Sequence, residues 1–208
     1  GRGGHSYFAL DVTKRTAPKF LFSFSNDPAN KQIYYWSASG TRAGHPYGTI
    51  SSDYDYSKLG EAWSTPSIVL AATSRGVRRK WVAAFGAGFN AGINPNYGSA
   101  VYVVDLENEG KVLNRIDLTD NSGGLANSLP SQLTAVTADT TSVADYSGAM
   151  LYGADLESKV WKINLTNDGS LYSATNLFDG QGDDNNGRSN FFAVTPSIGT
   201  DGKLWLYF

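Results

Sequence analysis

Short runs of aliphatic, β-branched and aromatic residues alternate with polar turns along the whole chain. These runs are residues 7–12, 20–24, 67–72, 81–86, 101–106, 112–118, 132–138, 150–153, 160–165, 176–179, 197–200 and 204–208. Each has the length and composition of a pleated, half-buried strand. Turns such as Asp168 and Gly169 separate them, and Asp-Gly is a strong hairpin signal. The pattern predicts an all-β fold of short antiparallel strands.

A proline-centred motif recurs at nearly constant spacing. It reads T-P-S-I at residues 65–68, L-P-S-Q at residues 129–132 and T-P-S-I at residues 195–198, with prolines 64 and then 66 residues apart. Self-similarity at a fixed period indicates a repeat architecture. Each motif opens a unit of several short strands, and four such strands make a propeller blade. The repeat therefore predicts a β-propeller of four-stranded antiparallel blades.

The repeat divides the chain into five parts. They are a half blade at residues 1–25, an insertion at residues 26–62, blades at residues 63–118 and 128–179, and a half blade at residues 193–208. The first half blade is assigned because residues 7–12 resemble the third strand of each unit and residues 20–24 resemble the fourth. Propellers close with about four to eight blades. We therefore expect one domain that is part of a larger propeller, flanked by other domains of a longer chain.

Composition narrows the class of protein. The 208 residues are 41% hydrophobic and include 12 Tyr, 10 Phe and 5 Trp, which is ample for a packed core. The net charge is −2, whereas nucleic-acid binding needs an excess of basic residues on one face. No stretch is apolar for long enough to span a membrane as a helix. The absence of cysteine excludes disulfides, thiol catalysis and cysteine-based metal sites.

Four motifs resemble one family in its own order. They are a glycine-rich start followed by Y-F-A-L-D-V-T at residues 7–13, L-G-E-A-W-S-T-P at residues 59–66, F-G-A-G-F-N at residues 85–90, and L-Y-G-A-D-L with V-W-K within residues 151–162. The ordered set is similar to the PilY/PilC-type tip adhesins of type IV pili. The resemblance implies a quinoprotein-like β-propeller in the C-terminal half of a large bacterial protein.

The same resemblance implies a function. It implies a role in pilus biogenesis and in cell adhesion, at the pilus (fimbrium) tip, the cell surface or the outer membrane. The expected partners are minor pilins or the pilus tip, and a host or abiotic surface. We therefore predict an extracellular, non-enzymatic binding and assembly module.

One family feature is degenerate in this chain. Members often carry a calcium loop, D-x-D-x-D-G-x-x-D, before the L-Y strand. In this sequence Asp139 and Asp145 remain, but Val143 stands where another carboxylate is expected. Calcium takes six to eight oxygen ligands. We interpret this stretch as a surface loop, with a calcium site at Asp139 and Asp145 as the alternative, and we assign no other cofactor.

The insertion at residues 26–62 is rich in aromatic residues. They are Tyr34, Tyr35, Trp36, Tyr47, Tyr54 and Tyr56. Tyrosine and tryptophan are enriched at recognition surfaces, which makes these residues a candidate binding surface. The same side chains could equally pin the insertion to the propeller, and the sequence leaves both interpretations open.

Candidate catalytic residues are few. The two histidines, His5 and His45, lie in turn-like segments, and Asp105 and Asp155 stand at strand ends, where aspartate commonly caps its own backbone. We therefore expect no enzyme. Two alternatives stay open: a quinoprotein-type propeller enzyme related to pyrroloquinoline-quinone dehydrogenases, and a scaffold propeller of outer-membrane assembly. The dehydrogenases often use a vicinal cysteine pair, and this chain has no cysteine.

Overall fold

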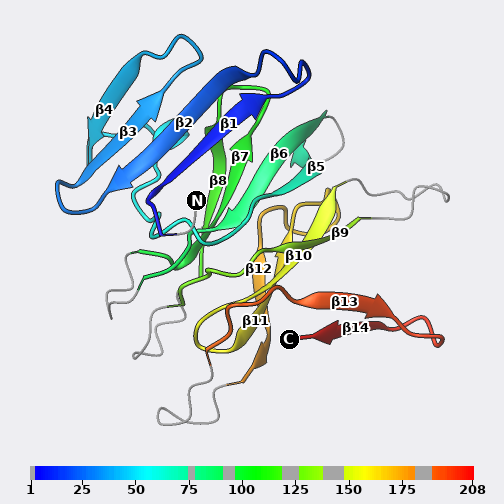
Figure 1. The fold of residues 1–208 in the computed structure, drawn as a ribbon. Helices are drawn as coiled ribbons and strands as arrows, with labels where there is room; N and C mark the ends of the chain where they lie inside the picture. The colour runs from blue at the N-terminus through cyan, green and yellow to red at the C-terminus, as the bar shows by residue number, and fades with distance from the viewer. Residues whose placement is uncertain (1–2, 75–77, 91–96, 119–126, 138–147, 181–188) are drawn as a thin grey trace.

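The computed structural model describes residues 3–74, 78–90, 97–118, 127–137, 148–180 and 189–208. In these ranges the chain forms three four-stranded antiparallel sheets and one two-stranded hairpin (Figure 1). A 3-10 turn, η1 (Ser52–Tyr54), follows the first sheet. The predicted all-β fold with four-stranded antiparallel sheets is confirmed.

The first sheet, sheet I, uses the N-terminal quarter of the chain. Its strands follow chain order: β1 (Ser6–Asp11), β2 (Lys19–Asp27), β3 (Gln32–Trp36) and β4 (Arg42–Pro46). Side chains of β3 alternate between the two faces. Ile33 and Tyr35 are buried against the next sheet, while Tyr34 and Trp36 lie on the opposite face.

Sheet I differs from the sequence interpretation of a half blade at residues 1–25 and an insertion at residues 26–62. Strands β3 and β4 lie within the expected insertion and complete the sheet. Strands β1 and β2 are therefore the first and second strands of their sheet, and not the third and fourth. The error has a physical cause: aromatic residues favour both strands and recognition loops, so the tyrosines of β3 do not distinguish the two.

Two further sheets and a hairpin follow. Sheet II contains β5 (Ser67–Ser74), β6 (Arg78–Gly86), β7 (Ala100–Asp105) and β8 (Lys111–Asp117). Sheet III contains β9 (Thr134–Thr137), β10 (Ala149–Ala154), β11 (Lys159–Asn164) and β12 (Ala174–Asp179). The hairpin contains β13 (Thr195–Ile198) and β14 (Leu204–Tyr207). Strands are hydrogen-bonded in chain order in each, so β7 and β11 are both third strands.

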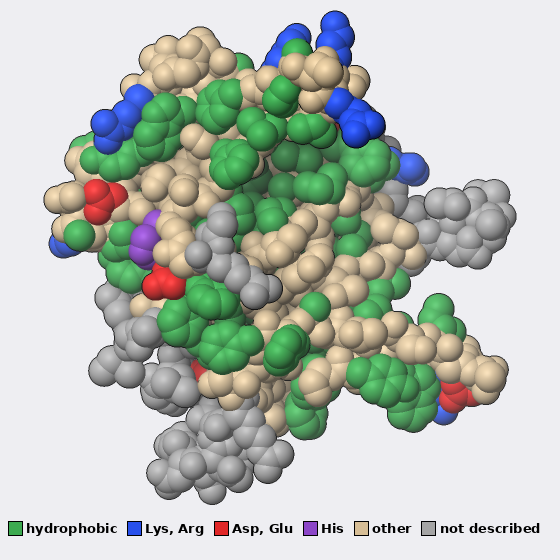
Figure 2. All heavy atoms as spheres, viewed as in Figure 1, with side chains coloured by type: hydrophobic (Ala, Val, Ile, Leu, Met, Phe, Trp, Pro, Cys, Tyr) green, Lys and Arg blue, Asp and Glu red, His purple; other side chains and the backbone are tan. Residues whose placement is uncertain are grey.

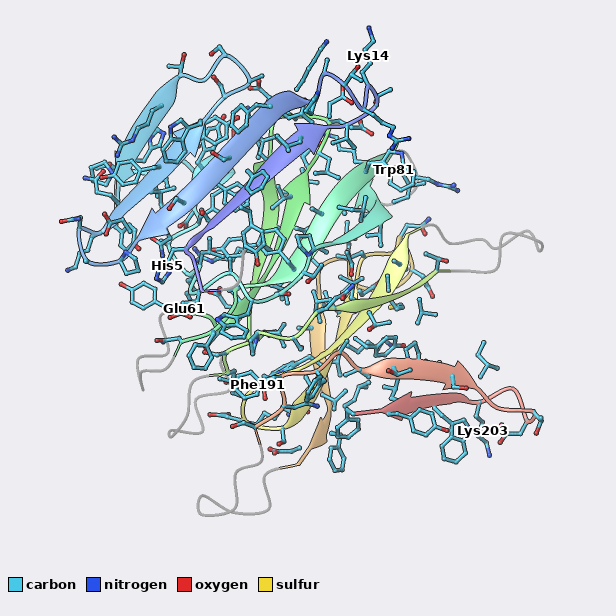
Figure 3. All side chains as sticks on the ribbon, in the orientation of Figure 1. His5, Lys14, Glu61, Trp81, Phe191 and Lys203 are labelled. Atoms are coloured by element: carbon cyan, nitrogen blue, oxygen red, sulfur yellow. The ribbon has the colours of Figure 1, made fainter. Side chains whose placement is uncertain are left out.

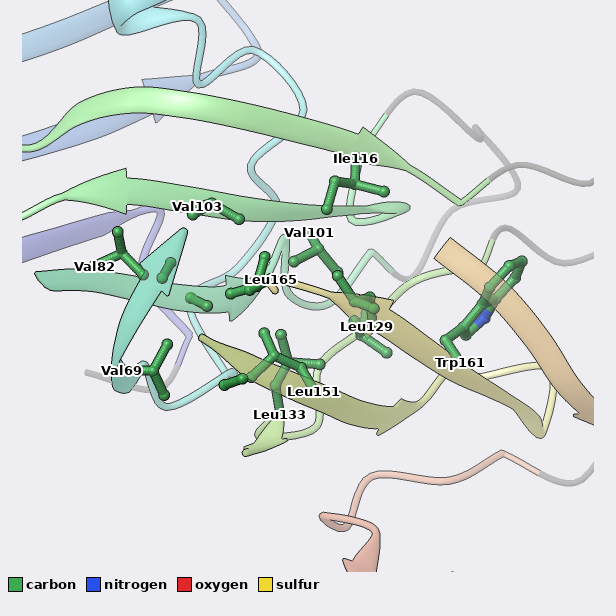
Figure 4. Close-up of a cluster of buried hydrophobic side chains, with 14 of the residues drawn as sticks. Val69, Val82, Val101, Val103, Ile116, Leu129, Leu133, Leu151, Trp161 and Leu165 are labelled. Atoms are coloured by element: carbon green, nitrogen blue, oxygen red, sulfur yellow. The ribbon is translucent and has the colours of Figure 1, made fainter. Parts of the chain in front are cut away.

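The sheets stack in succession, as propeller blades do (Figure 1). One hydrophobic cluster lies between sheets I and II, a second between sheets II and III, and a smaller one between sheet III and the hairpin. Figure 4 shows the second cluster, where Val101 and Val103 of sheet II meet Leu151 of sheet III. The first strands of successive units also touch, since β9 contacts both β5 and β13.

Strand β7 is buried on both faces, whereas its composition predicted a half-buried strand. Every residue from Ala100 to Asp105 is buried. Tyr102 and Val104 pack in the cluster toward sheet I, while Val101 and Val103 pack in the cluster toward sheet III. A strand that is covered on both faces needs apolar residues at odd and even positions alike. It therefore lacks the alternation of apolar and polar residues seen in a strand with only one buried face.

The segments that precede β5 and β9 hold neighbouring sheets together. Ser64 is almost fully buried, and its hydroxyl donates to the carbonyl of Ser131 at 2.8 Å while it accepts from the amide of Gly86 at 3.0 Å. The Ser131 hydroxyl donates in turn to the carbonyl of Ala154 at 2.8 Å. The recurrence seen in the sequence therefore marks the buried connections between units.

Candidate binding surface

Two of the six candidate aromatic residues are core residues. Tyr56 is 0% exposed and Tyr35 is 6% exposed. The Tyr35 hydroxyl donates to the carbonyl of Glu109 at 2.8 Å, and the Tyr56 hydroxyl donates to the carbonyl of Gly110. Burial raises the pKa of both hydroxyls above the ordinary tyrosine value, so both stay protonated donors. Tyr35 of sheet I and Tyr56 of the segment after η1 are thus both bound to the β7–β8 turn and do not offer a contact surface.

Tyr47 and Tyr54 also hold the segment that follows sheet I. The Tyr47 hydroxyl donates to the side-chain oxygen of Asn26, and the amide nitrogen of Asn26 donates to the carbonyl of Leu59 at 2.6 Å. The Tyr54 ring lies 4.7 Å from the Tyr35 ring, centroid to centroid. Both side chains are half-buried and pack against the hydrophobic cluster between sheets I and II.

The remaining pair, Tyr34 and Trp36, lies on the outer face of sheet I, together with a cation. Their ring centroids are 6.2 Å apart. The guanidinium carbon of Arg42 lies 3.9 Å from the centroid of the Tyr34 ring and 5.7 Å from that of the Trp36 ring. Such a position over aromatic faces is attractive, because the ring quadrupole presents negative charge to the cation. We call Tyr34, Trp36 and Arg42 the aromatic–arginine surface.

Strand register positions these three side chains. Trp36 pairs with Arg42 on β4 and with Ser23 on β2, and Tyr34 pairs with Gly44. A Cβ atom at residue 44 would lie 3.4 Å from the Tyr34 ring, so the glycine leaves room for the ring to lie against the strand. Sequence reasoning missed Arg42, although its place on the same face follows from the pairing of β3 with β4.

The buried carboxylate of Asp155 closes a turn. Its oxygens accept from the backbone amides of Glu157 and Lys159, both at 2.9 Å, and from the ring nitrogen of Trp161 at 2.7 Å and the side chain of Asn127 at 3.0 Å. Burial raises the pKa of Asp155, and these donors lower it only in part. Every contact is to the protein's own turn and its neighbours, which is the structural role expected from the sequence.

Asp105 has the equivalent role in sheet II. It is fully buried, accepts from the amide of Glu107 at 2.9 Å, and pairs with the ammonium of Lys80. Asp139 and Asp145, the calcium candidates, lie outside the described residues. Among the residues that the structure does describe, no three His, Asp or Glu side chains are grouped closely enough to hold a metal ion.

A comparison with protein families decides the relationship. The family model for the PilY1 beta-propeller domain matches residues 1–199. The chain belongs to the PilY1 family. The three stacked four-stranded sheets are thus blades of a PilY1 propeller, and the resemblance read from the sequence motifs is confirmed. No curated protein and no solved structure gave a match.

Membership of the PilY1 family makes this a type IV pilus-associated protein. The described part of the chain contains no helix that is both long and apolar enough to cross a membrane.

Proposed function

We propose that this PilY1 propeller is a non-enzymatic binding and assembly module of a type IV pilus tip protein, at the bacterial cell surface. It acts in pilus biogenesis and in attachment to a host or abiotic surface, with minor pilins or the pilus tip as its partners within the pilus. The observation that carries the binding role is the aromatic–arginine surface on the outer face of sheet I.

The chemistry of this surface supports binding. Tyr, Trp and Arg are the residues most enriched among those that dominate binding energy. The Arg42 guanidinium already lies over the Tyr34 ring, so little side-chain freedom remains to be lost when a partner docks. Phe8, which is 64% exposed, extends the apolar area on the same face through its pairing with Ser23.

The buried carboxylates support a non-enzymatic role. A catalytic acid or base must reach a reacting group. The oxygens of Asp155 accept four hydrogen bonds from its own turn and its neighbours, and those of Asp105 are held by the Glu107 amide and by Lys80. Both groups are fully buried. These contacts account for why the sequence places aspartate at both strand ends.

A single substitution separates binding from catalysis. Asp105→Asn in the full-length protein keeps the shape and the turn-capping oxygen but removes the carboxylate. We expect normal numbers of surface pili and normal attachment, because neither depends on an ionised group at this position. A strain in which the propeller is deleted from the protein gives the reference level for the loss of surface pili and of attachment. Loss of attachment by Asp105→Asn, with the variant folded and displayed, would contradict the proposal.

A further inference from the structure

A cavity lies between sheets I and II, and none of Tyr34, Trp36 and Arg42 lines it. Its volume is about 350 Å³, within the range of ligand-binding sites. The lining side chains are apolar or aromatic, with Ala9 and Phe22 on the side of sheet I and Ile68, Ala83 and Val104 on the side of sheet II. Figure 2 shows a hollow surrounded by hydrophobic side chains on this face of the molecule. The sequence did not indicate it, because it forms only where two sheets meet.

The cavity follows the edge of β1. Four consecutive residues from Tyr7 to Leu10 line it, although alternate side chains of a strand point to opposite faces. Because residues from both faces of β1 line the cavity, its opening must run along the edge of this strand. Within the described residues, the only strand that pairs with β1 is β2.

The register shows which backbone groups face this opening. The amide of Asn26 donates to the carbonyl of His5, so residues 5 and 26 form a hydrogen-bonded pair. Such pairs alternate along an antiparallel ladder, which makes Tyr7 with Phe24 the next one. The backbone N–H and C=O groups of Ser6 and Phe8 therefore point away from β2, toward the opening.

Positive charge lies at one end of the opening. The hairpin between β1 and β2 carries exposed Lys14, Arg15 and Lys19. The one carboxylate at the base of this hairpin, Asp11, accepts from the amide of Thr13 at 2.9 Å. Figure 3 shows Lys14 at the hairpin and Trp81 on the neighbouring side of sheet II. Figure 2 shows Lys and Arg side chains at the same end of the hollow.

We propose that the free edge of β1 binds an extended segment of a partner protein. The segment adds a strand to sheet I, alternates apolar residues that fill the cavity, and carries acidic residues at the end beside Lys14 and Lys19. Strand addition of this kind takes affinity from main-chain hydrogen bonds and specificity from alternate side chains. This inference goes beyond the proposed function, since it uses neither Trp36 nor Arg42.

The backbone groups favour a peptide over a hydrocarbon ligand. An acyl chain in the cavity would remove water from the N–H and C=O groups of Ser6 and Phe8 and give them no partner. A buried polar group without a hydrogen bond is unfavourable. An added strand pairs these groups and also fills the space between Ala9 and Ala83, and its acidic end matches the charge of the hairpin.

A peptide titration tests the proposal on the full chain. The probe is a fluorescein-labelled synthetic peptide with two aspartates at one end and alternating isoleucine and threonine over the length of β1. Its control is the same peptide with N-methyl groups on alternate amides, which cannot pair with a strand. We expect the fluorescence anisotropy of the first peptide to rise to saturation as protein is added. The second peptide should bind at least about tenfold more weakly, since main-chain hydrogen bonds are lost.

Protein variants locate the site. Phe8→Pro removes an amide that faces the opening, at an edge position where proline is tolerated. Phe8→Ala is its matched control, because it loses the same exposed ring but keeps the amide. We expect about tenfold weaker binding for Phe8→Pro than for Phe8→Ala. Ala83→Leu, which fills the cavity, and Lys14→Glu with Lys19→Glu, which reverses the charge, should also weaken binding.

Three results would overturn the proposal. One is an absence of binding to the folded wild-type chain. Another is equal affinity of the wild-type chain for the two peptides. This comparison does not depend on the folding of any variant. The third is a competition result: dodecanoate displaces the peptide, and it binds Phe8→Pro and Phe8→Ala with equal affinity. This result would assign the cavity to an anionic acyl chain. None of these results bears on attachment through the aromatic–arginine surface, so the two proposals can fail separately.

Discussion

The hydroxyl of Tyr35 donates a hydrogen bond to the carbonyl of Glu109 at 2.8 Å. Tyr35 belongs to β3 of sheet I, and Glu109 belongs to the turn between β7 and β8 of sheet II. The adjacent Gly110 accepts from Tyr56 and has a φ of 76°, and a Cβ at this position would overlap the Phe22 ring. The β7–β8 turn of sheet II therefore accepts hydrogen bonds both from β3 of sheet I and from the segment that follows sheet I.

This contact predicts that the tyrosines between residues 26 and 62 stabilise the fold. Tyr35→Phe should lower the free energy of unfolding by about 1 kcal/mol, because it leaves the Glu109 carbonyl without its partner. Tyr56→Ala should lower it by about 4 kcal/mol, as expected for a buried aromatic residue. Urea denaturation measures both. Trimming residues 30–56 should unfold the chain, and a folded trimmed chain would show that these residues form an independent loop.

A close approach of two strands predicts a severe effect at Gly86. A Cβ at this residue would overlap the carbonyl oxygen of Leu129, and Gly88 donates to that same carbonyl at 3.2 Å. Gly86→Ala should therefore destabilise the protein by more than about 2 kcal/mol. Gly44→Ala is the matched strand control, since its Cβ would make an ordinary contact with Tyr34. Similar unfolding midpoints for the two variants would contradict the close packing of Gly86 against Leu129.

The buried Asp155 predicts a dependence of stability on pH. Burial raises its pKa in the folded chain, so the folded state holds this proton over a pH range in which the unfolded state has released it. Stability from this group is then highest at acid pH and falls as pH rises through the folded pKa. The excess stability of wild type over Asp155→Asn should shrink between about pH 4 and pH 7. An excess that grows with pH would mean that the pKa of Asp155 is lowered on folding and not raised.

The degenerate loop predicts weak calcium binding. Val143 replaces a carboxylate between Asp139 and Asp145, which leaves too few charged oxygens for a tight site. Calorimetric titration of the full chain should give no site tighter than about millimolar, the range of weak extracellular modules. Removing calcium with a chelator should leave the unfolding midpoint unchanged. A micromolar site that Asp139→Ala abolishes would show that the family's calcium loop functions in this protein.

The sequence was informative where a pattern had one physical meaning. The proline-centred repeat predicted units of four antiparallel strands, and its three prolines lie at or shortly before the first strands β5, β9 and β13. The tyrosines of β3 were ambiguous, because the same side chains suit a core and a contact surface. Only the pairing of β3 with β2 and β4 separates Tyr35, which is buried, from Trp36, which is on the outer face. The cavity between Ala9 and Ala83 depends on the distance between two sheets, which no local pattern encodes.

The number of attached cells per surface pilus tests the central claim most directly. The variant is Trp36→Ser with Arg42→Ser in the full-length protein, and the matched control is Phe192→Ser, which removes an aromatic side chain that is 81% exposed elsewhere. We expect the double variant to keep wild-type pilus numbers and thermal stability but to attach at least about tenfold less, since Trp and Arg dominate binding energy at contact surfaces. Unchanged attachment by the double variant, or an equal loss in Phe192→Ser, would contradict a binding role for the outer face of sheet I.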